Sequence, residues 1–324
     1  MTQPPSLPTR LSLSVAFAGK AALLFGVVLC LAQSGRADIT EYAVFGNRQV
    51  TLGNGTTISG SVGTNQTRDS EGDPEGSLLA GNDISVGGNV NVGGDAVFGA
   101  RDTVTGLVST GGSLSYLDPF TSGGYGVFAP VGMPAPATFS AGTVNLLNPT
   151  TIAPGRYGEL DLRLGTELNR QVLTLGPGNY FFQNFSALDY VTLKLDIGPA
   201  DVVGIYVAGN VSIRDGFAMD PGGGTANHIY GQTSGGWSIG NDGKWFGTIY
   251  APSYDEVYTD YGALSIGSNF AFTGALYGQR VSIGDGSMLT LQALDFPGVV
   301  IPAPGAVALG AIGLGLIGFL RRRF

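Results

Sequence analysis

The sequence predicts an all-β domain built as a parallel β-solenoid (β-helix). Glycine makes up 54 of the 324 residues, far above its usual share of about 7%. The mean hydropathy is +0.21 although only 12% of the residues are charged, which excludes a polar, disordered chain. This composition indicates many short strands joined by glycine turns. Two internal repeats give the third reason for a solenoid.

The first repeat has a period of six residues, with copies that begin at Ile84, Val90, Ala96 and Asp102. Apolar and polar residues alternate within each copy, which turns one side of a short strand inward. Because six residues suffice for one strand and one turn, we expect each copy to form one side of a triangular solenoid.

The second repeat has a period of 27 residues and aligns 237–250 with 264–277. Related fragments occur at 204–213 and 281–284. A period of this length fits one full coil of a solenoid, and successive coils stack about 4.8 Å apart. The alignment predicts that Ile239 stacks on Ile266 inside the solenoid and that Tyr250 lies near Tyr277.

Prolines interrupt the pattern between residues 103 and 149. The five prolines there are Pro119, Pro130, Pro134, Pro136 and Pro149. We interpret this stretch as an irregular excursion after which the solenoid resumes, the alternative being a true domain boundary.

The N-terminal residues 1–37 have the pattern of a secretory signal peptide. Arg10 and Lys20 precede an apolar run, Ala21–Ala32, and small residues follow up to Ala37. Twelve apolar residues are too few to cross a bilayer, which needs about 20. We therefore expect cleavage between Ala37 and Asp38.

The C-terminal residues 299–324 have the pattern of a membrane anchor. Two prolines precede an apolar, glycine-rich run that ends at Leu320, and three arginines follow it. The residues that define the pattern are Pro302, Ala303, Pro304, Arg321, Arg322 and Arg323. The arginines favour a transmembrane helix whose C-terminus stays cytoplasmic, which would leave the solenoid domain, residues 38–298, outside the cell.

This tail resembles the PEP-CTERM sorting signal of exosortase-processed bacterial proteins. Ala303 stands where that family has a glutamate, so the tail resembles a Pro-Ala-Pro variant. The resemblance implies an exosortase-type processing enzyme as partner and removal of residues 321–324. The alternative is an ordinary single-pass anchor without processing.

The middle of the chain resembles a solenoid domain that recurs in secreted, surface-anchored bacterial proteins. The matching segments are APGRYGELDL at 153–162, GPGNYFF at 176–182, GIYVAGNVSI at 204–213, FGTIYAP at 246–252 and GALYGQRVSIG at 274–284. The six-residue repeats are also loosely similar to those of bactofilins, which are polymer-forming β-solenoids.

The charge distribution excludes two classes of partner. All 24 acidic residues lie between Asp38 and Asp295 with only ten of the 16 basic ones, which gives that stretch a net charge of −14. Nucleic acids and anionic lipids require clusters of Lys and Arg. The sole cysteine, Cys30, lies in the predicted signal peptide, so we expect neither a disulfide nor a thiol nucleophile in the mature protein.

The sequence predicts no catalytic residue, no cofactor and no metal site. The single histidine, His228, has no nucleophile motif beside it and is interpreted as structural. Carboxylate pairs such as Asp215 with Asp220, or Asp242 with Asp285, are compatible with polysaccharide cleavage or calcium binding. Asp and Asn beside glycines more commonly stabilise turns.

One segment favours glycan binding. Residues 253–261 join the two 27-residue repeats and place Tyr254, Tyr258 and Tyr261 among three acidic residues. Tyrosine rings stack on sugars and carboxylates accept hydroxyl hydrogen bonds, although an exposed connecting loop has the same composition.

The preferred hypothesis is therefore a non-enzymatic protein of the cell surface or extracellular matrix, associated with exopolysaccharide, adhesion or envelope structure. The two alternatives are a polysaccharide lyase or hydrolase on the same scaffold and a self-assembling solenoid polymer.

Overall fold

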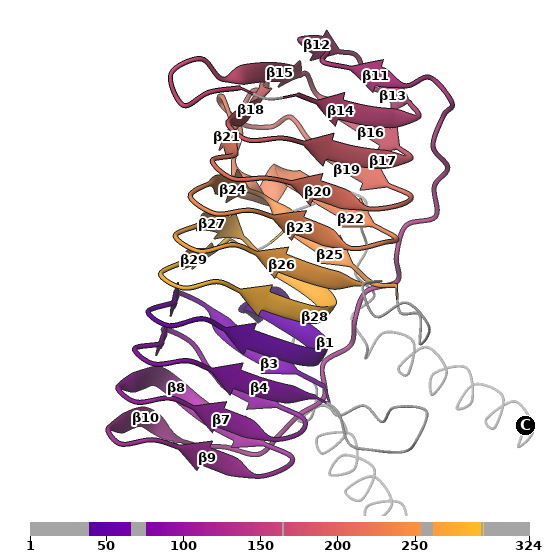
Figure 1. The fold of residues 1–324 in the computed structure, drawn as a ribbon. Helices are drawn as coiled ribbons and strands as arrows, with labels where there is room; N and C mark the ends of the chain where they lie inside the picture. Colours follow the sequence, from indigo (N-terminus) through magenta and orange to yellow (C-terminus); the bar gives the residue numbers. More distant parts are fainter. Residues whose placement is uncertain (1–38, 66–75, 164, 254–261, 293, 295–324) are drawn as a thin grey trace, which may run out of the picture. The chain divides into compact units, whose positions relative to one another are not determined.

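The computed structural model describes residues 39–65, 76–163, 165–253, 262–292 and 294. In these residues the chain forms one continuous parallel β-solenoid with three faces (Figure 1). Every strand pairing is parallel, as expected when each coil lies directly on the next. Two short 3-10 helices complete the described elements, η1 (Ile39–Glu41) and η2 (Ala226–His228). Among the described residues, none of the helices has the length and apolar character needed to cross a membrane.

Face A contains, in stacking order, β11 (Leu146–Leu147), β14 (Glu159–Leu162), β17 (Asn184–Ala187), β20 (Val211–Ile213), β23 (Trp237–Ile239), β26 (Ala263–Ile266), the end of β28 (Leu276–Ile283), the end of β1 (Tyr42–Leu52), β4 (Ser77–Ala80), β7 (Ala96–Phe98) and β9 (Leu114–Tyr116).

Face B contains, in the same order, β12 (Thr151–Ile152), β15 (Gln171–Leu175), β18 (Val191–Leu195), β21 (Ala218–Asp220), β24 (Lys244–Phe246), β27 (Ala271–Gly274), β29 (Met288–Leu291), β2 (Thr57–Ile58), β5 (Ser85–Val86), the start of β8 (Asp102–Thr110) and the start of β10 (Phe120–Tyr125).

Face C contains β13 (Gly155–Arg156), β16 (Gly178–Phe182), β19 (Val203–Val207), β22 (Ile229–Thr233), β25 (Thr248–Ala251), the starts of β28 and β1, β3 (Ser61–Thr64), β6 (Val90–Val92) and the ends of β8 and β10.

The predicted registers are confirmed. Ile239 pairs with Ile266 and both are buried, and Tyr250 pairs with Tyr277. The six-residue copies occupy successive faces, so three of them make one coil and Val86 pairs with Val104. The coil is thus shorter in this half of the chain than in the half with the 27-residue repeat, which has room for longer strands on face C.

The solenoid does not follow the order of the chain. The N-terminal half starts in the middle of the stack at β1 and proceeds to β10, and the C-terminal half starts at the opposite end with β11. It returns until β28 and β29 pair with β1 and β2 (Figure 1). Two stretches of chain that are distant in sequence therefore share one core.

Residues 126–145, here called the strap, connect the two ends of the stack along the outside of face C. Its residues hydrogen-bond to face C and to the connections beside it: Ala129 to Asn91, Val131 to Asn65, and Ala137 to Gln232. The strands continue to Tyr125, so the irregular run is shorter than the 103–149 expected from its prolines. Pro119 lies in the connection between β9 and β10, where no ladder hydrogen bond is needed.

The inward side chains form a continuous apolar core. The largest fully buried ones include Trp237, Trp245, Phe217, Phe270 and Phe272, with the two tryptophan rings 5.3 Å apart at 85°. Full burial of each large apolar side chain contributes about 1.5–3 kcal/mol. Because one core runs through the stack, the three outer surfaces keep a fixed geometry.

Candidate binding face

A row of small hydroxyl side chains runs along the outside of face A. In each strand the residue between two inward apolar residues points outward, and the strand register brings these residues together. The row, here called the hydroxyl ladder, consists of Ser186, Ser212, Ser238, Ser265, Ser282 and Thr51.

The ladder is accessible and uncharged. Ser212, Ser238, Ser265 and Ser282 are exposed, and adjacent hydroxyls are one strand spacing apart, about 4.8 Å. Asp161 precedes the ladder and accepts a hydrogen bond of 2.9 Å from the Ser186 hydroxyl. The ladder thus presents a regular series of groups that both donate and accept hydrogen bonds.

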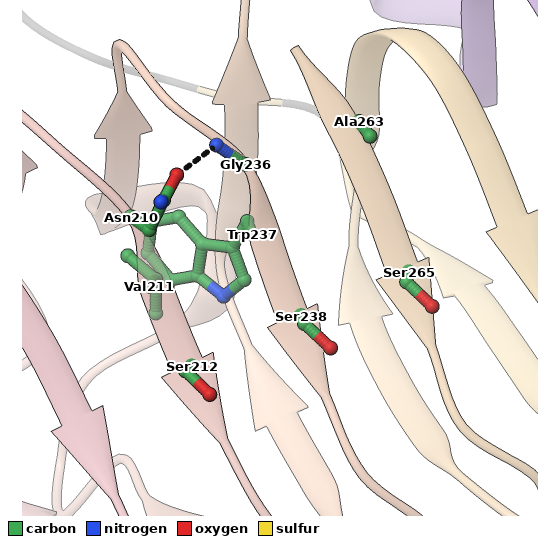
Figure 2. A pocket seen from close by; sticks show the side chains of 8 residues that line it. All are labelled: Asn210, Val211, Ser212, Gly236, Trp237, Ser238, Ala263 and Ser265. Atoms are coloured by element: carbon green, nitrogen blue, oxygen red, sulfur yellow. Dashed lines mark hydrogen bonds between the residues drawn. The ribbon is translucent and has the colours of Figure 1, made fainter. Parts of the chain in front are cut away.

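A shallow, open depression of about 340 Å³ lies beside the middle of the ladder. Figure 2 shows its lining, with three ladder serines on consecutive strands. The lining residues are Asn210, Val211, Ser212, Gly236, Trp237, Ser238, Ala263 and Ser265.

The depression exists because two neighbouring positions carry almost no side chain. Gly236 and Ala263 directly precede Trp237 and Leu264, which pair in β23 and β26. On the side of β20 the depression is bounded by Asn210, whose Oδ1 accepts a hydrogen bond of 2.8 Å from the Gly236 N–H (Figure 2). The Asn210 amide is therefore fixed at the rim rather than free to rotate.

The other two faces offer a different surface. The strap covers part of face C, where Phe139 lies 5.3 Å from the ring of Tyr206 and the Tyr250 hydroxyl donates to the Pro134 carbonyl. Burial raises the pKa of Tyr206 and Tyr250 above the usual value. On face B an outward row includes paired Lys194 and Asp220. Face A is distinguished by its uniform, uncharged row.

The carboxylates considered for catalysis or calcium stabilise turns. Asp215 Oδ1 accepts a hydrogen bond of 2.7 Å from the Asn241 N–H, and Asp285 Oδ1 accepts one of 2.7 Å from the Asn54 N–H. Asn241 repeats the contact one coil further on, to the Ser268 N–H. Within the described parts of the chain, no three metal-binding side chains gather into one group.

His228 lies in η2, partly buried. The other predicted site residues lie outside the described residues. These are Ala37 and Asp38 at the expected signal cleavage site, Tyr254, Tyr258 and Tyr261 of the possible glycan site, and Pro302, Ala303, Pro304, Arg321, Arg322 and Arg323 of the tail. Sequence reasoning did not identify the hydroxyl ladder, although the triplets 211–213, 237–239 and 281–283 all have serine between two core residues.

Comparison with known proteins finds no matching family model and no matching curated protein. Solved structures with some similarity are ice-binding proteins. One from an Antarctic biological consortium is 16% identical, with a TM-score of 0.38, and covers 78% of this chain and 88% of its own. One from the Antarctic ascomycete Antarctomyces psychrotrophicus is 10% identical, with a TM-score of 0.37, and covers 78% and 95%. The DUF3494 domain of Shewanella frigidimarina ice-binding protein 1 is 13% identical, with a TM-score of 0.39, and covers 79% and 96%.

Proposed function

We propose that this chain is an exported, non-enzymatic surface or matrix protein that binds an extended neutral polysaccharide along face A. The observation that carries the proposal is the hydroxyl ladder, which continues from Ser186 to Thr51 without a charged side chain. A glycan chain laid across the strands meets one hydroxyl at each step, and each net hydrogen bond contributes about 0.5–1.5 kcal/mol.

The charge of the chain selects among polysaccharides. The region between Asp38 and Asp295 carries a net charge of −14, which repels polymers of uronic acids or sulfated sugars. The lining of the depression contains no charged side chain, and its serine and asparagine side chains match the hydroxyl groups of neutral sugars.

Export and anchoring are part of the proposal and rest on the two termini. The signal peptide ending at Ala37 would deliver the domain across the membrane. The tail with Pro302 and Pro304 would hold the C-terminus in the cytoplasm until an exosortase-type enzyme releases it. The domain would then act at the cell surface or in the extracellular matrix.

The test removes three ladder hydroxyls at once, with Ser212→Ala, Ser238→Ala and Ser265→Ala in one variant. The matched control is the triple variant Thr57→Ala, Ser85→Ala and Thr103→Ala, which removes three exposed hydroxyls that also pair in a row, on face B. The probes are a soluble β-1,4-glucan and a uronic-acid polymer of matched length, measured by calorimetry.

The wild-type protein is expected to bind the neutral glucan and not the uronic-acid polymer. The face A variant should bind the glucan at least tenfold more weakly, since 1.4 kcal/mol is a factor of ten, and the face B variant should bind it as the wild type does. Equal binding by all three proteins, or no binding by any, would overturn the proposal.

A second candidate, adsorption to ice, is favoured by the regularity of the ladder. Hydroxyls fixed at one strand spacing of about 4.8 Å form a repeating two-dimensional surface with little conformational freedom. The same two variants distinguish the candidates. Inhibition of ice recrystallisation that is lost in the face A variant, together with no glucan binding by the wild type, would replace the polysaccharide by ice.

A further inference from the structure

Exposed apolar side chains concentrate toward the two ends of the described solenoid. Seven belong to the strands and connections toward β9 and β10: Leu79, Val97, Leu107, Tyr116, Leu117, Tyr125 and Val127. Four belong to the opposite end, around β11 and β15: Val144, Leu147, Leu168 and Val172. In the described middle of the stack only Met288 is comparable. Large exposed apolar patches commonly mark interaction sites.

Both ends also present unpaired strand edges. Among the described strands, β9 pairs only with β7 and β10 only with β8. At the other end β11, β12 and β13 each pair with one strand. Exposed edges are usually protected by lysine or proline, yet none of these five strands contains either residue. Pro119, Pro149 and Pro154 all lie in the connections between them.

The chain itself shows what such ends can bind. At the internal junction β28 pairs with β1 on faces A and C, and β29 pairs with β2 on face B. These coils are not neighbours in sequence, so the junction is a docking of two separate solenoid ends. All three pairings are parallel and bring Val281 onto Val50 in the core.

Charge permits the same docking between the outer ends. Residues 105–127 carry one charge, Asp118, and residues 140–158 carry one of opposite sign, Arg156. Two copies therefore avoid at their ends the repulsion expected between acidic domains. A partner must offer three parallel edges in a triangular arrangement, and a second copy of this chain has them.

We propose that copies of this protein stack head to tail, with the β9–β10 end of one copy against the β11–β13 end of the next. A translation along the stack keeps every strand parallel. The contact is heterologous and leaves one free end of each type, so it generates open filaments rather than closed dimers. This assembly is independent of what face A binds.

The test places a lysine on each edge separately. Ser115→Lys modifies the exposed centre of β9, and Leu147→Lys modifies the exposed end of β11. The control is Val97→Lys, which is exposed in the same row as Ser115 but lies on β7, a strand with neighbours on both sides. Mature protein is examined by analytical ultracentrifugation over a range of concentrations.

The wild type and Val97→Lys are expected to form a concentration-dependent series of oligomers, and each edge variant alone should be monomeric. An equimolar mixture of Ser115→Lys and Leu147→Lys should form dimers and nothing larger, because each protein retains one competent end. A monomeric wild type, or edge variants that assemble like the wild type, would overturn the proposal. A single edge variant that still dimerises would show a symmetric contact instead.

Discussion

Thr51 of β1 pairs with Ser282 of β28, although the two residues come from opposite ends of the solenoid sequence. The pairing completes the hydroxyl ladder across the internal junction. It follows from the core beneath, where Val50 lies on Val281 and Leu52 on Ile283, all of them buried. The binding face is therefore continuous only while the two halves of the chain are docked.

The first prediction concerns this junction. Leu276 is fully buried and pairs with Val44 across it. Leu276→Ala is expected to lower the free energy of unfolding by about 2–5 kcal/mol, the range for removing a buried leucine side chain. Urea denaturation measures the change. Leu79→Ala, at a 41% exposed leucine on face A, should shift it by less than about 0.5 kcal/mol, and equal effects would contradict a packed junction.

The registers within each half could be predicted from sequence because neighbouring coils repeat the same residues. Ile239 and Ile266 share a spacing of 27 with Tyr250 and Tyr277, and so large a coincidence has a simple structural cause. The irregular stretch was located by its prolines, but a proline in a connection does not end a solenoid, so the extent of that stretch was overestimated.

The junction and the ladder could not be predicted in the same way. Parallel pairing requires only apolar inward residues, and every coil supplies them, so the sequence does not say which coil lies on β1. The serine at position 212 looks like an ordinary polar residue between two core residues. Its role in a row becomes visible only when the register of all the strands is known.

The second prediction concerns the strap. Gln232 forms two hydrogen bonds with one strap residue, since the Ala137 N–H donates to Oε1 over 3.1 Å and Nε2 donates to the Ala137 carbonyl over 2.9 Å. Gln232→Leu removes both and leaves two backbone groups without these partners, at a cost of about 1–3 kcal/mol. The strap should then open more often, and chymotrypsin should cleave it about tenfold faster.

Gln171→Leu serves as the control for the strap, because Gln171 lies on face B in β15. Cleavage sites are identified by mass spectrometry, and Phe139 is the expected site because its ring packs on Phe181 and Tyr206 only while the strap is in place. Unchanged cleavage in Gln232→Leu would show that apolar contacts alone hold the strap.

The third prediction concerns the tail. If an exosortase-type enzyme processes the protein, the mature form isolated from cells lacks residues 321–324, and intact-mass measurement detects their loss. Replacing Pro302 and Pro304 by alanine should leave the full-length form in the membrane fraction, whereas Pro252→Ala, at a proline in the domain, should not. Mature protein that retains Arg321, Arg322 and Arg323 would contradict processing.

The fourth prediction is a pH dependence that originates at Asp102. This carboxylate is buried, and its Oδ1 accepts a hydrogen bond of 2.8 Å from the Ile84 N–H. Desolvation by burial raises the pKa of Asp102 above its ordinary value, despite that hydrogen bond. The unfolded chain therefore releases the proton at a lower pH than the folded protein. Its contribution to stability is complete below about pH 3.9, the ordinary aspartate pKa, and is lost as the pH rises through the folded pKa.

Asp102→Asn keeps the acceptor oxygen and removes the charge. The variant is expected to melt at a higher temperature than the wild type at pH 7, and the difference should shrink toward zero as the pH falls to about 3.9. Asp220→Asn is the control, because Asp220 is an exposed carboxylate on β21 that likewise accepts a backbone hydrogen bond, from the Gly222 N–H. Thermal unfolding followed by circular dichroism between pH 3 and pH 7 measures both variants. An Asp102→Asn protein that melts below the wild type at pH 7 would mean that the ionised carboxylate stabilises the turn more than its burial destabilises it.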